Sequence, residues 1–395
     1  MEAITLKILL IHNEYVYKGG EDSVFEAESK LLREHGHEVV ELKISNKNIR
    51  NPNFFMKIKI AFGTIWSWKS YKLVKKKIIE VNPDIVHVHN TFPQFSPSIY
   101  WAIKSAKKPV VQTIHNFRLT CANALLYREN NICELCLKKS KLYSLKNRCY
   151  RNSLFATLPI TLMQIFHTLI GTFNKKVDTY IALTEFSKNI MVQAGIKKEK
   201  IVVKPNFIQN NEDIEKPNYN RKKRFIYVGR ISEEKGLDLL LEAFSKLRSP
   251  FELVIIGEGP EKERLVKKYQ QNPKVFWLGY MSKEKVLKEI KNSYALVMPS
   301  KWYETFGMVV IEAFSVGTPV IVPNHGGFPS LVKEMENGLL FNPSDKNDLQ
   351  KKLELISKRD IMEKLSKNAI LSFQNNYSSW KNYKQLMQIY NKLLD

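Results

Sequence analysis

Short apolar runs alternate along the chain with longer segments in which apolar residues recur every three or four positions. The apolar runs cover residues 7–11, 39–42, 84–89, 110–115, 225–230, 251–257, 275–279, 295–300 and 320–322. Largely apolar runs of this length are typical of strands buried on both faces of a parallel sheet. The segments between them, such as 23–35 and 237–247, have the period of a helix. The alternation predicts doubly wound α/β domains, with ligand sites at the carboxyl ends of the strands.

A polar, charged segment, 209–223, interrupts this alternation and is typical of a linker. A chain of 395 residues is long enough for two domains with ample cores. We therefore expect an N-terminal domain over residues 1–207 and a C-terminal domain over residues 208–374, followed by a helical end.

The stretch 300–327, SKWYETFGMVVIEAFSVGTPVIVPNHGG, carries much of the candidate chemistry. The apolar run from Met308 to Phe314 predicts a short helix that begins just after Phe306 and Gly307. The backbone N–H groups at a helix N-terminus beside a glycine suit a diphosphate.

Two carboxylates accompany this predicted helix. Glu304 precedes it, and Glu312 lies inside its apolar run. One alternative is that both are ordinary solvated acids, but the apolar neighbours of Glu312 make solvation a poor explanation, because a buried glutamate needs a partner. Carboxylates can accept hydrogen bonds from hydroxyl groups around a bound diphosphate. A ligand that is both anionic and rich in hydroxyls is a nucleotide sugar.

Two cations follow the strand at 225–230. Arg230 and Lys235 flank a loop with the planar fork and the point charge that together suit a diphosphate. Surface solvation is the alternative for both. The next strand ends in a second glycine loop, Gly257-Glu-Gly259, which lacks the third glycine of a dinucleotide fingerprint. NAD binding is therefore not supported.

The N-terminal half has its own candidate site residues. Gly20 closes a glycine pair between the first strand and the first helix, an arrangement that favours phosphate. His87, His89 and His115 lie at or next to strand ends, where a histidine is commonly only a polar cap. His115, which precedes Asn116, is the stronger functional candidate.

All four cysteines lie close together in the sequence, at Cys121, Cys133, Cys136 and Cys149. A CxxC pair with two flanking cysteines predicts a structural tetrathiolate zinc site, although the outer spacing is looser than in common zinc modules. Such a site would fix the loop 119–150 and leave no open position for catalysis. Unligated thiols are the alternative.

The net charge of +23 is concentrated in the N-terminal half, because residues 1–205 contribute +16. This half therefore favours an anionic partner, either nucleic acid, anionic lipid or an acidic acceptor. Residues 54–77 mix aromatic and aliphatic side chains with lysines, and residues 152–174 contain no Asp, Glu, Lys or Arg. A stripe of threonines and a glutamine argues against a membrane span and predicts an amphipathic helix, packed on the domain or lying in a membrane interface. No signal peptide is apparent.

A set of ordered motifs connects these observations. They are Gly19-Gly20, His115, Gly229-Arg230 with Lys235-Gly236, Gly257-Glu-Gly259, Pro299-Ser300, Glu304 with Glu312, Gly317-Thr-Pro319-Val320 and Gly326-Gly327. The set resembles the family 4 glycosyltransferases, retaining enzymes of the GT-B fold, over nearly the whole chain. The segments 115–121 and 148–151 resemble a bacterial subgroup that builds cell-surface polysaccharides.

The resemblance implies two Rossmann-like domains facing across a cleft, with the C-terminal helix, 375–395, returning to the first domain. It implies that Arg230 and Lys235 hold the donor diphosphate. Glu312 would bind the ribose hydroxyls and Glu304 the hydroxyls of the donor sugar, beside the amides of Phe306, Gly307 and Met308.

For the N-terminal domain, the resemblance implies that Gly20 lets the loop approach the phosphate and that His115 faces the sugar near the reacting carbon. No cofactor or metal would be needed for catalysis, because cations and a helix dipole neutralise the leaving diphosphate. One departure is Ser330, which stands where the family usually has a glutamate.

The implied reaction is transfer from a nucleotide-diphosphate sugar to a lipid-linked saccharide acceptor, by a cytoplasmic enzyme held on the inner, anionic face of the plasma membrane. Two alternatives remain. A sugar-nucleotide isomerase or epimerase would turn over the donor without an acceptor. A nucleic-acid-binding protein is suggested by charge alone, and no recognised module supports it, so we expect no nucleic-acid partner.

Overall fold

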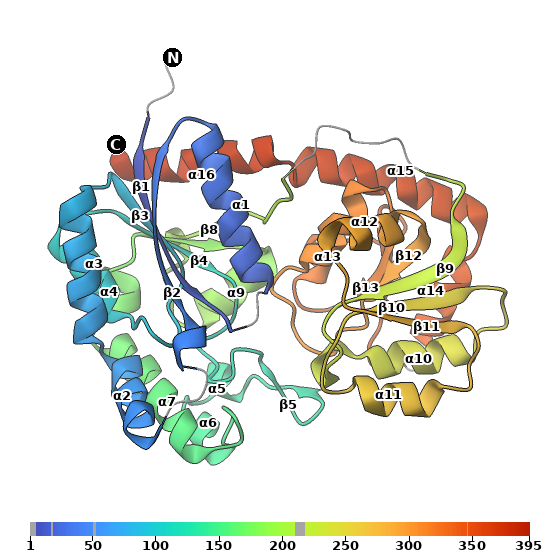
Figure 1. The fold of residues 1–395 in the computed structure, drawn as a ribbon, viewed down its shortest axis with the longest axis horizontal. Helices are drawn as coiled ribbons and strands as arrows, with labels where there is room; N and C mark the ends of the chain where they lie inside the picture. Colours follow the sequence, from blue (N-terminus) through green and yellow to red (C-terminus); the bar gives the residue numbers. More distant parts are fainter. Residues whose placement is uncertain (1–4, 17–18, 50–52, 210–217, 346) are drawn as a thin grey trace. The chain divides into compact units, whose positions relative to one another are not determined.

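The computed structural model describes residues 5–16, 19–49, 53–209, 218–345 and 347–395, which form two compact units. Unit 1 comprises Met1–Leu126, Cys133–Pro205 and Asn382–Asp395, and unit 2 comprises Tyr127–Ile132 and Asn206–Lys381. Each unit is an α/β domain built on a parallel sheet with helices on both faces (Figure 1). The predicted fold class is therefore confirmed.

The sheet of unit 1 has six parallel strands in the order β2-β1-β3-β4-β7-β8. The strands are β1 Lys7–Glu14, β2 Glu38–Ser45, β3 Ile85–Asn90, β4 Val110–Ile114, β7 Thr179–Ala182 and β8 Ile201–Val203. Since β2 and β3 flank β1 on opposite sides, the strand order reverses at β1 and β3. The carboxyl ends of these strands are where such a sheet places a ligand site.

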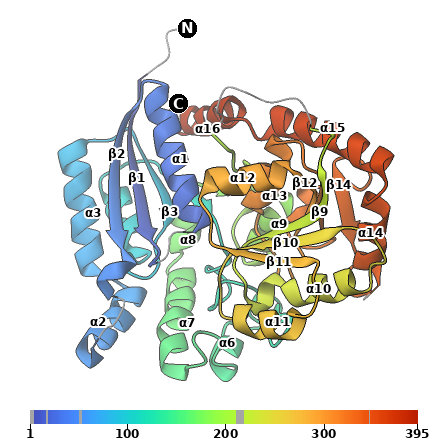
Figure 2. The same ribbon diagram turned by 45° about the vertical axis from the view of Figure 1, so that its right-hand side comes forward.

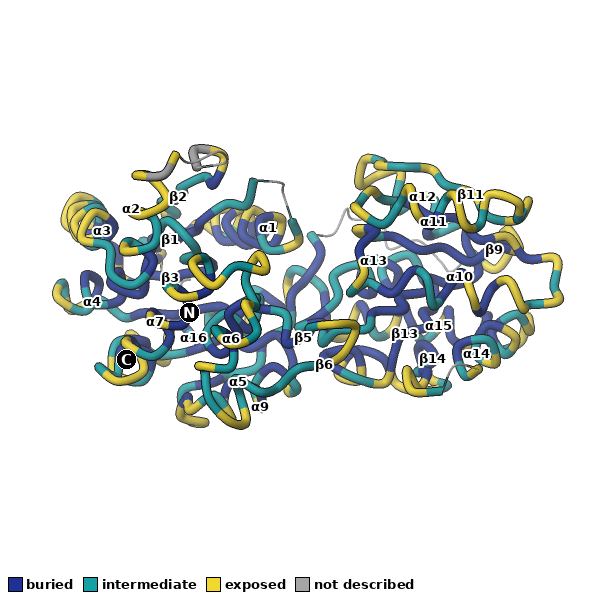
Figure 3. The backbone as a smooth tube through the Cα atoms, turned by 90° about the horizontal axis from the view of Figure 1, so that it is seen from below, coloured by how far each residue is buried: buried dark blue, intermediate teal, exposed yellow. Residues whose placement is uncertain are grey.

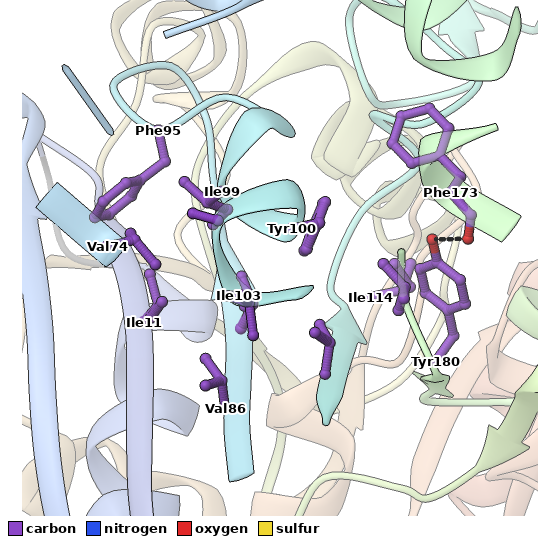
Figure 4. Close-up of a cluster of buried hydrophobic side chains, with 14 of the residues drawn as sticks. Ile11, Val74, Val86, Phe95, Ile99, Tyr100, Ile103, Ile114, Phe173 and Tyr180 are labelled. Carbon is purple, nitrogen blue, oxygen red and sulfur yellow. Dashed lines mark hydrogen bonds between the residues drawn. The ribbon is translucent and has the colours of Figure 1, made fainter. Parts of the chain in front are cut away.

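The helices of unit 1 are α1 Gly20–Glu34, α2 Phe54–Ile65, α3 Trp68–Val81, α4 Ser98–Ser105, α7 Leu154–Leu169, α8 Thr172–Lys175, α9 Glu185–Gln193 and α16 Ser379–Leu394. Alternate residues of β1 pack on opposite faces of the sheet, as the pleat requires. Ile11 packs in the cluster that includes Val74 and Ile103 of α3 and α4 (Figure 4). Leu10 packs on the other face with Phe25 of α1 and Tyr390 of α16. The chain's last helix is therefore part of the core of unit 1.

The sheet of unit 2 also has six parallel strands, in the order β11-β10-β9-β12-β13-β14. They are β9 Lys222–Val228, β10 Glu252–Ile256, β11 Val275–Gly279, β12 Ser293–Val297, β13 Val320–Pro323 and β14 Gly338–Phe341. The helices are α10 Leu237–Ser245, α11 Lys262–Tyr269, α12 Lys283–Lys291, α13 Met308–Ser315, α14 Asp348–Ile356 and α15 Arg359–Asn376. In Figure 2, α10 and α11 lie on one side of this sheet, and α12 and α13 lie on the other.

Short elements complete the described structure. They are the hairpin β5 Tyr127–Arg128 and β6 Asn131–Ile132, the one-turn helices α5 Leu135–Lys138 and α6 Tyr143–Lys146, and the 3₁₀ turns η1 Asn46–Ile49, η2 Lys198–Lys200, η3 Glu233–Lys235 and η4 Phe328–Ser330. The reversal point of the unit 2 sheet lies between β9 and β12. The loops that follow these strands contain Arg230 and Lys235 after β9 and Glu304 after β12.

Helix α7 is amphipathic, as predicted, but its polar side faces the protein. Thr157, Thr161, Gln164 and His167 are each 0% exposed, whereas Leu169 on the apolar side is 80% exposed. Thr161 bonds the Ser144 hydroxyl, and Nε2 of Gln164 donates to the Arg118 carbonyl. Oε1 of Gln164 is buried without a hydrogen-bond partner among the described residues.

Helix α2 packs beside α7 and is also largely exposed (Figure 3). The exposed apolar side chains of these two helices are Phe55, Met56, Ile58, Phe62, Leu154, Phe155, Leu158, Leu162, Phe166 and Leu169, which we call the α2–α7 surface. None of the described helices is long and apolar enough to cross a membrane.

Candidate active site

Glu304 is the centre of a polar cluster at the carboxyl end of β12 in unit 2. Its side chain is largely buried, and its Oε1 atom accepts three hydrogen bonds. The donors are Lys235 Nζ at 2.6 Å, Trp302 Nε1 at 2.9 Å and the Ser300 hydroxyl at 3.1 Å. The interpretation of Glu304 as a solvated loop acid is therefore wrong. All three donors bond to Oε1, so none of these three hydrogen bonds involves Oε2.

The glycine pair Gly326-Gly327, one of the predicted motifs, holds the loop around Glu304 in place. The N–H of Gly327 donates to the carbonyl of Glu304 at 2.7 Å. A Cβ atom at Gly327 would lie 2.7 Å from the Thr305 carbonyl oxygen, so a larger residue would push the two loops apart. His325 adds a bond between its Nε2 and the carbonyl oxygen of Ser300, at 2.9 Å. The turn after β13 thus positions the loop after β12.

Lys235 reaches Glu304 because the turn that carries it packs against the same loop. It ends η3, and Gly236 after it is left-handed, with φ of 69°. A Cβ atom at Gly236 would lie 2.1 Å from the Pro299 carbonyl oxygen, which only glycine avoids. The Lys235 ammonium also lies 5.0 Å from the centre of the Trp302 ring. Two of the predicted donor-site residues are therefore in direct contact.

The other predicted donor residues surround the same reversal point without touching Glu304. Arg230 follows β9 with an exposed side chain, and within the described residues no ion pair holds its guanidinium. Its neighbour in the loop, Ile231, donates its N–H to Glu258 in the loop after β10. Gly257, in that second loop, donates its N–H to the Gly279 carbonyl at 2.8 Å. Backbone bonds thus tie the loops after β9 and β10 to each other and to the end of β11.

Helix α13 begins at Met308, with Gly307 as its N-cap residue and Phe306 buried before it, as predicted. Glu312 lies on this helix with its side chain 15% exposed, and Lys283 Nζ of α12 lies 3.8 Å from Oε1. Burial raises the pKa of Glu312, and Lys283 opposes the shift only partly. Ser330 ends η4 and is exposed.

In unit 1, Gly20 is the first residue of α1, and the residue after it is a carboxylate that sequence reasoning missed. Glu21 accepts a hydrogen bond from the Tyr15 hydroxyl at 2.8 Å and lies 3.3 Å from Asn116 Nδ2. Burial raises the pKa of Glu21 to about 7, against the lowering effect of those bonds. The only signal in the sequence is its position directly after the glycine pair.

His115 follows β4 and lines a cavity of about 50 Å³ together with His89, Asn116 and Arg118. Its Nε2 atom lies 3.1 Å from Nδ1 of His89. Burial lowers the pKa of His115 well below its usual value, so the ring is neutral at neutral pH. His87 and His89 are not solvent-facing caps of β3, because both are buried.

The four cysteines, all among the described residues, form no disulfide. Burial, and then the neighbouring thiols of Cys121, Cys149 and Cys133, raise the pKa of Cys136 to about 12. The Cys121 thiol donates to Oδ1 of Asn123 at 2.9 Å, and burial raises its pKa. The donor set suits zinc chemically. Among the described residues, however, a different group has its potential metal-ligand atoms within 4.8 Å of one another. It consists of Glu28, His87 and His89.

Comparison with known proteins gives matches along both units. A family model described as glycosyltransferase family 4 matches residues 19–212, and one described as glycosyl transferases group 1 matches residues 209–372. A 42.6 kDa protein of the cps region of Klebsiella pneumoniae is 24% identical over 361 residues, which cover 84% of this chain and 89% of the relative.

Two solved structures extend the likeness to the fold. HepE of Anabaena, in complex with UDP, is 17% identical with a TM-score of 0.67, covering 98% of this chain and 100% of HepE. Sucrose-phosphate synthase of Thermosynechococcus elongatus is 18% identical with a TM-score of 0.71, covering 98% of both chains. The matched families account for both units and for the loops that carry Lys235 and Glu304. The chain belongs to the family 4 glycosyltransferases and has their GT-B fold.

Proposed function

We propose that the protein is a retaining glycosyltransferase that moves a hexose from a nucleotide-diphosphate sugar to a lipid-linked saccharide during synthesis of a cell-surface polysaccharide. The observation that carries the proposal is the contact between Lys235 and Glu304 at the reversal point of the unit 2 sheet. A parallel sheet binds its ligand at this place. The cps-region relative and the solved complexes of HepE with UDP and with UDP-glucose support the pathway and the donor class.

The donor would be held by complementary charge. Arg230 and Lys235 supply positive charge for the diphosphate, and the N-terminus of α13 adds its dipole. Negative charge builds on the diphosphate as the bond to the sugar breaks, so these groups stabilise the leaving group. Glu304 Oε2, outside the three bonds that fix Oε1, would accept from hydroxyls of the sugar. The chemistry proposed here uses no metal or cofactor.

The α2–α7 surface supports a membrane-bound acceptor. An apolar side turned outward would be stable in a membrane interface, where lysines of α2 such as Lys57 and Lys59 would meet anionic lipid headgroups. We therefore place the enzyme at the cytoplasmic face of the plasma membrane, bound through unit 1.

The donor proposal is tested by calorimetric titration of UDP, GDP and their hexose conjugates into wild type, Lys235→Met and Arg230→Ala. Loss of one charged contact should weaken binding by about 10- to 150-fold. The matched control is Lys352→Met, since Lys352 forms an ion pair of the same 2.6 Å length with Glu334 elsewhere in unit 2. Equal affinity in all four proteins would contradict the donor site.

The reaction itself is tested by product analysis. An NMR spectrum of the anomeric proton should show the same configuration in product and donor. Inversion would contradict the retaining mechanism. Rapid conversion of the donor to an isomer without any acceptor would instead indicate the isomerase alternative.

A further inference from the structure

A buried polar cluster in unit 1 links α1, β3, β4 and α16 behind His115. Glu28 of α1 is at its centre, 1% exposed. Glu28 Oε1 lies 3.0 Å from His87 Nδ1 and 3.2 Å from His89 Nε2, and Oε2 lies 3.2 Å from Lys204 Nζ. His87 Nδ1 also contacts the Tyr390 hydroxyl of α16 at 2.7 Å. The donor site in unit 2 makes no use of this cluster.

Glu28 is an ionised carboxylate and therefore only accepts hydrogen bonds. Burial alone would raise its pKa, but the charge of Lys204 and the neighbouring imidazoles of His87 and His89 lower it well below its usual value. Lys204 is itself held by the Asn382 side chain, whose Oδ1 lies 3.0 Å from Nζ. The adjacent ammonium also makes a metal ion at Glu28 electrostatically unfavourable, so we assign none there.

An acceptor at Glu28 determines which nitrogen of His89 carries the proton. The His89 ring is neutral, because burial lowers its pKa to about 4. Its Nε2 has no well-aligned hydrogen-bond partner among the described residues and lies beside Glu28 Oε1. Two lone pairs facing each other in a buried site would be costly. The proton is therefore on Nε2, and Nδ1 of His89 is an acceptor.

The same argument determines which nitrogen of His115 carries the proton. Its Nε2 lies 3.1 Å from the acceptor Nδ1 of His89, so it must be the donor. A neutral ring with a proton on Nε2 has an unprotonated Nδ1. The carboxylate on α1 thus sets the tautomer of His115 through the ring of His89.

We propose that Glu28 and His89 are positioning residues that fix His115 as a neutral, Nε2-protonated ring, whose Nδ1 accepts a hydrogen bond from a hydroxyl of the reacting saccharide. The inference rests on the proposed sugar transfer. A neutral ring is needed for this role, because an imidazolium carries protons on both nitrogens and could only donate hydrogen bonds. With the other tautomer, His115 would present a donor from Nδ1 instead of an acceptor.

The first test is made on the wild-type protein, and one variant serves only to assign the signal. Two-bond ¹H–¹⁵N correlation spectra of ¹⁵N-histidine-labelled protein distinguish protonated from unprotonated ring nitrogens, and His115→Gln assigns the signal. At pH 7 we expect His115 to be protonated on Nε2 alone. A proton on Nδ1, or on both nitrogens, would overturn the inference.

The second test uses Glu28→Gln, whose amide can turn either its oxygen or its NH₂ group toward His89. The His115 signals should become a mixture of tautomers, and kcat should fall about tenfold with little change in KM for the donor. His37→Gln is the matched control, because His37 is also buried in unit 1 and contacts Tyr383 of α16 at 2.9 Å. An unchanged tautomer in Glu28→Gln, or an equal loss of kcat in His37→Gln, would overturn the positioning role.

The two proposals fail separately. If no nucleotide sugar serves as a donor, the proposed function is wrong, while the spectra of the wild-type protein still decide the tautomer. If transfer occurs but His115 is protonated on Nδ1, the function stands and the role of Glu28 is wrong.

Discussion

Lys235 and Glu304 form a 2.6 Å ion pair across 69 positions of the chain. The cation proposed for the diphosphate and the carboxylate proposed for the sugar hydroxyls are therefore coupled. A diphosphate that binds Lys235 competes with Glu304 for the same ammonium. The Trp302 and Ser300 bonds then keep Oε1 of Glu304 in place while the charge is shared.

Glu304→Gln should separate donor binding from turnover. The substitution removes the competing negative charge, so nucleoside diphosphate affinity should be retained or increased. Loss of a charged acceptor should lower kcat by about 10- to 150-fold. Calorimetry with UDP or GDP and initial rates with the conjugated sugar measure the two effects, and Glu334→Gln, from the Lys352 pair, is the control. A wild-type kcat in Glu304→Gln would exclude the assigned role.

Membrane binding should depend on the α2–α7 surface. Phe55 and Phe155 are 81% and 85% exposed, and replacing either with Ser should weaken vesicle binding by about 10- to 150-fold. Sedimentation with vesicles containing phosphatidylglycerol measures this, and added salt should also reduce binding. Tyr280→Ser is the control, because Tyr280 is 83% exposed in unit 2. The docking proposal fails if neutral vesicles recover the protein equally well.

We propose that the four cysteines hold one zinc ion per chain, which would bind as the thiols release their protons and become thiolate ligands. Elemental analysis of protein purified without chelator should find about one zinc, and Cys136→Ser should lose it together with thermal stability. A fully reduced, folded preparation that contains no zinc would remove the site and leave the four cysteines as unligated thiols.

Unit 1 should lose stability on acidification through His167. Burial lowers the pKa of His167 to about 4, with partial opposition from the Ile65 carbonyl, whereas the unfolded side chain titrates near 6.5. The unfolded state therefore binds more protons between these values, and stability falls as the pH falls from about 6.5 to about 4. The contribution is on the order of 3 kcal/mol. Urea unfolding of wild type and His167→Gln across this range measures it, and parallel pH profiles would contradict the prediction.

The strands and the loops that carry Lys235 and Glu304 could be predicted from the sequence because local signals define them. Apolar runs identified the buried strands, and the spacing of glycines beside Lys235 and Glu304 marked loops at strand ends. The contact between those two side chains follows from the sheet order, which brings the loops after β9 and β12 together.

The remaining features depend on partners that are distant in sequence. The spacing of the threonines predicted that α7 has a polar side and an apolar side. Which side packs on the protein is seen only from the contacts of the polar side with Ser144 and the Arg118 carbonyl. Glu28 is spaced so that it shares a helix face with Phe25 and Leu32, which indicates that it is buried. The sequence does not reveal its partner, because Lys204 is distant along the chain. The helical end is broken at Tyr377 between α15 and α16.

The place of α16 in the core of unit 1 constrains how the chain matures. Leu386 and Tyr390 complete a face of the sheet whose strands all precede Pro205. At the usual pace of translation, of about 5–20 residues per second, the first unit emerges from the ribosome with this face uncovered for many seconds. It reaches its native state only after the whole of the second unit has been synthesised, and a premature stop before residue 382 would leave that apolar face open to aggregation.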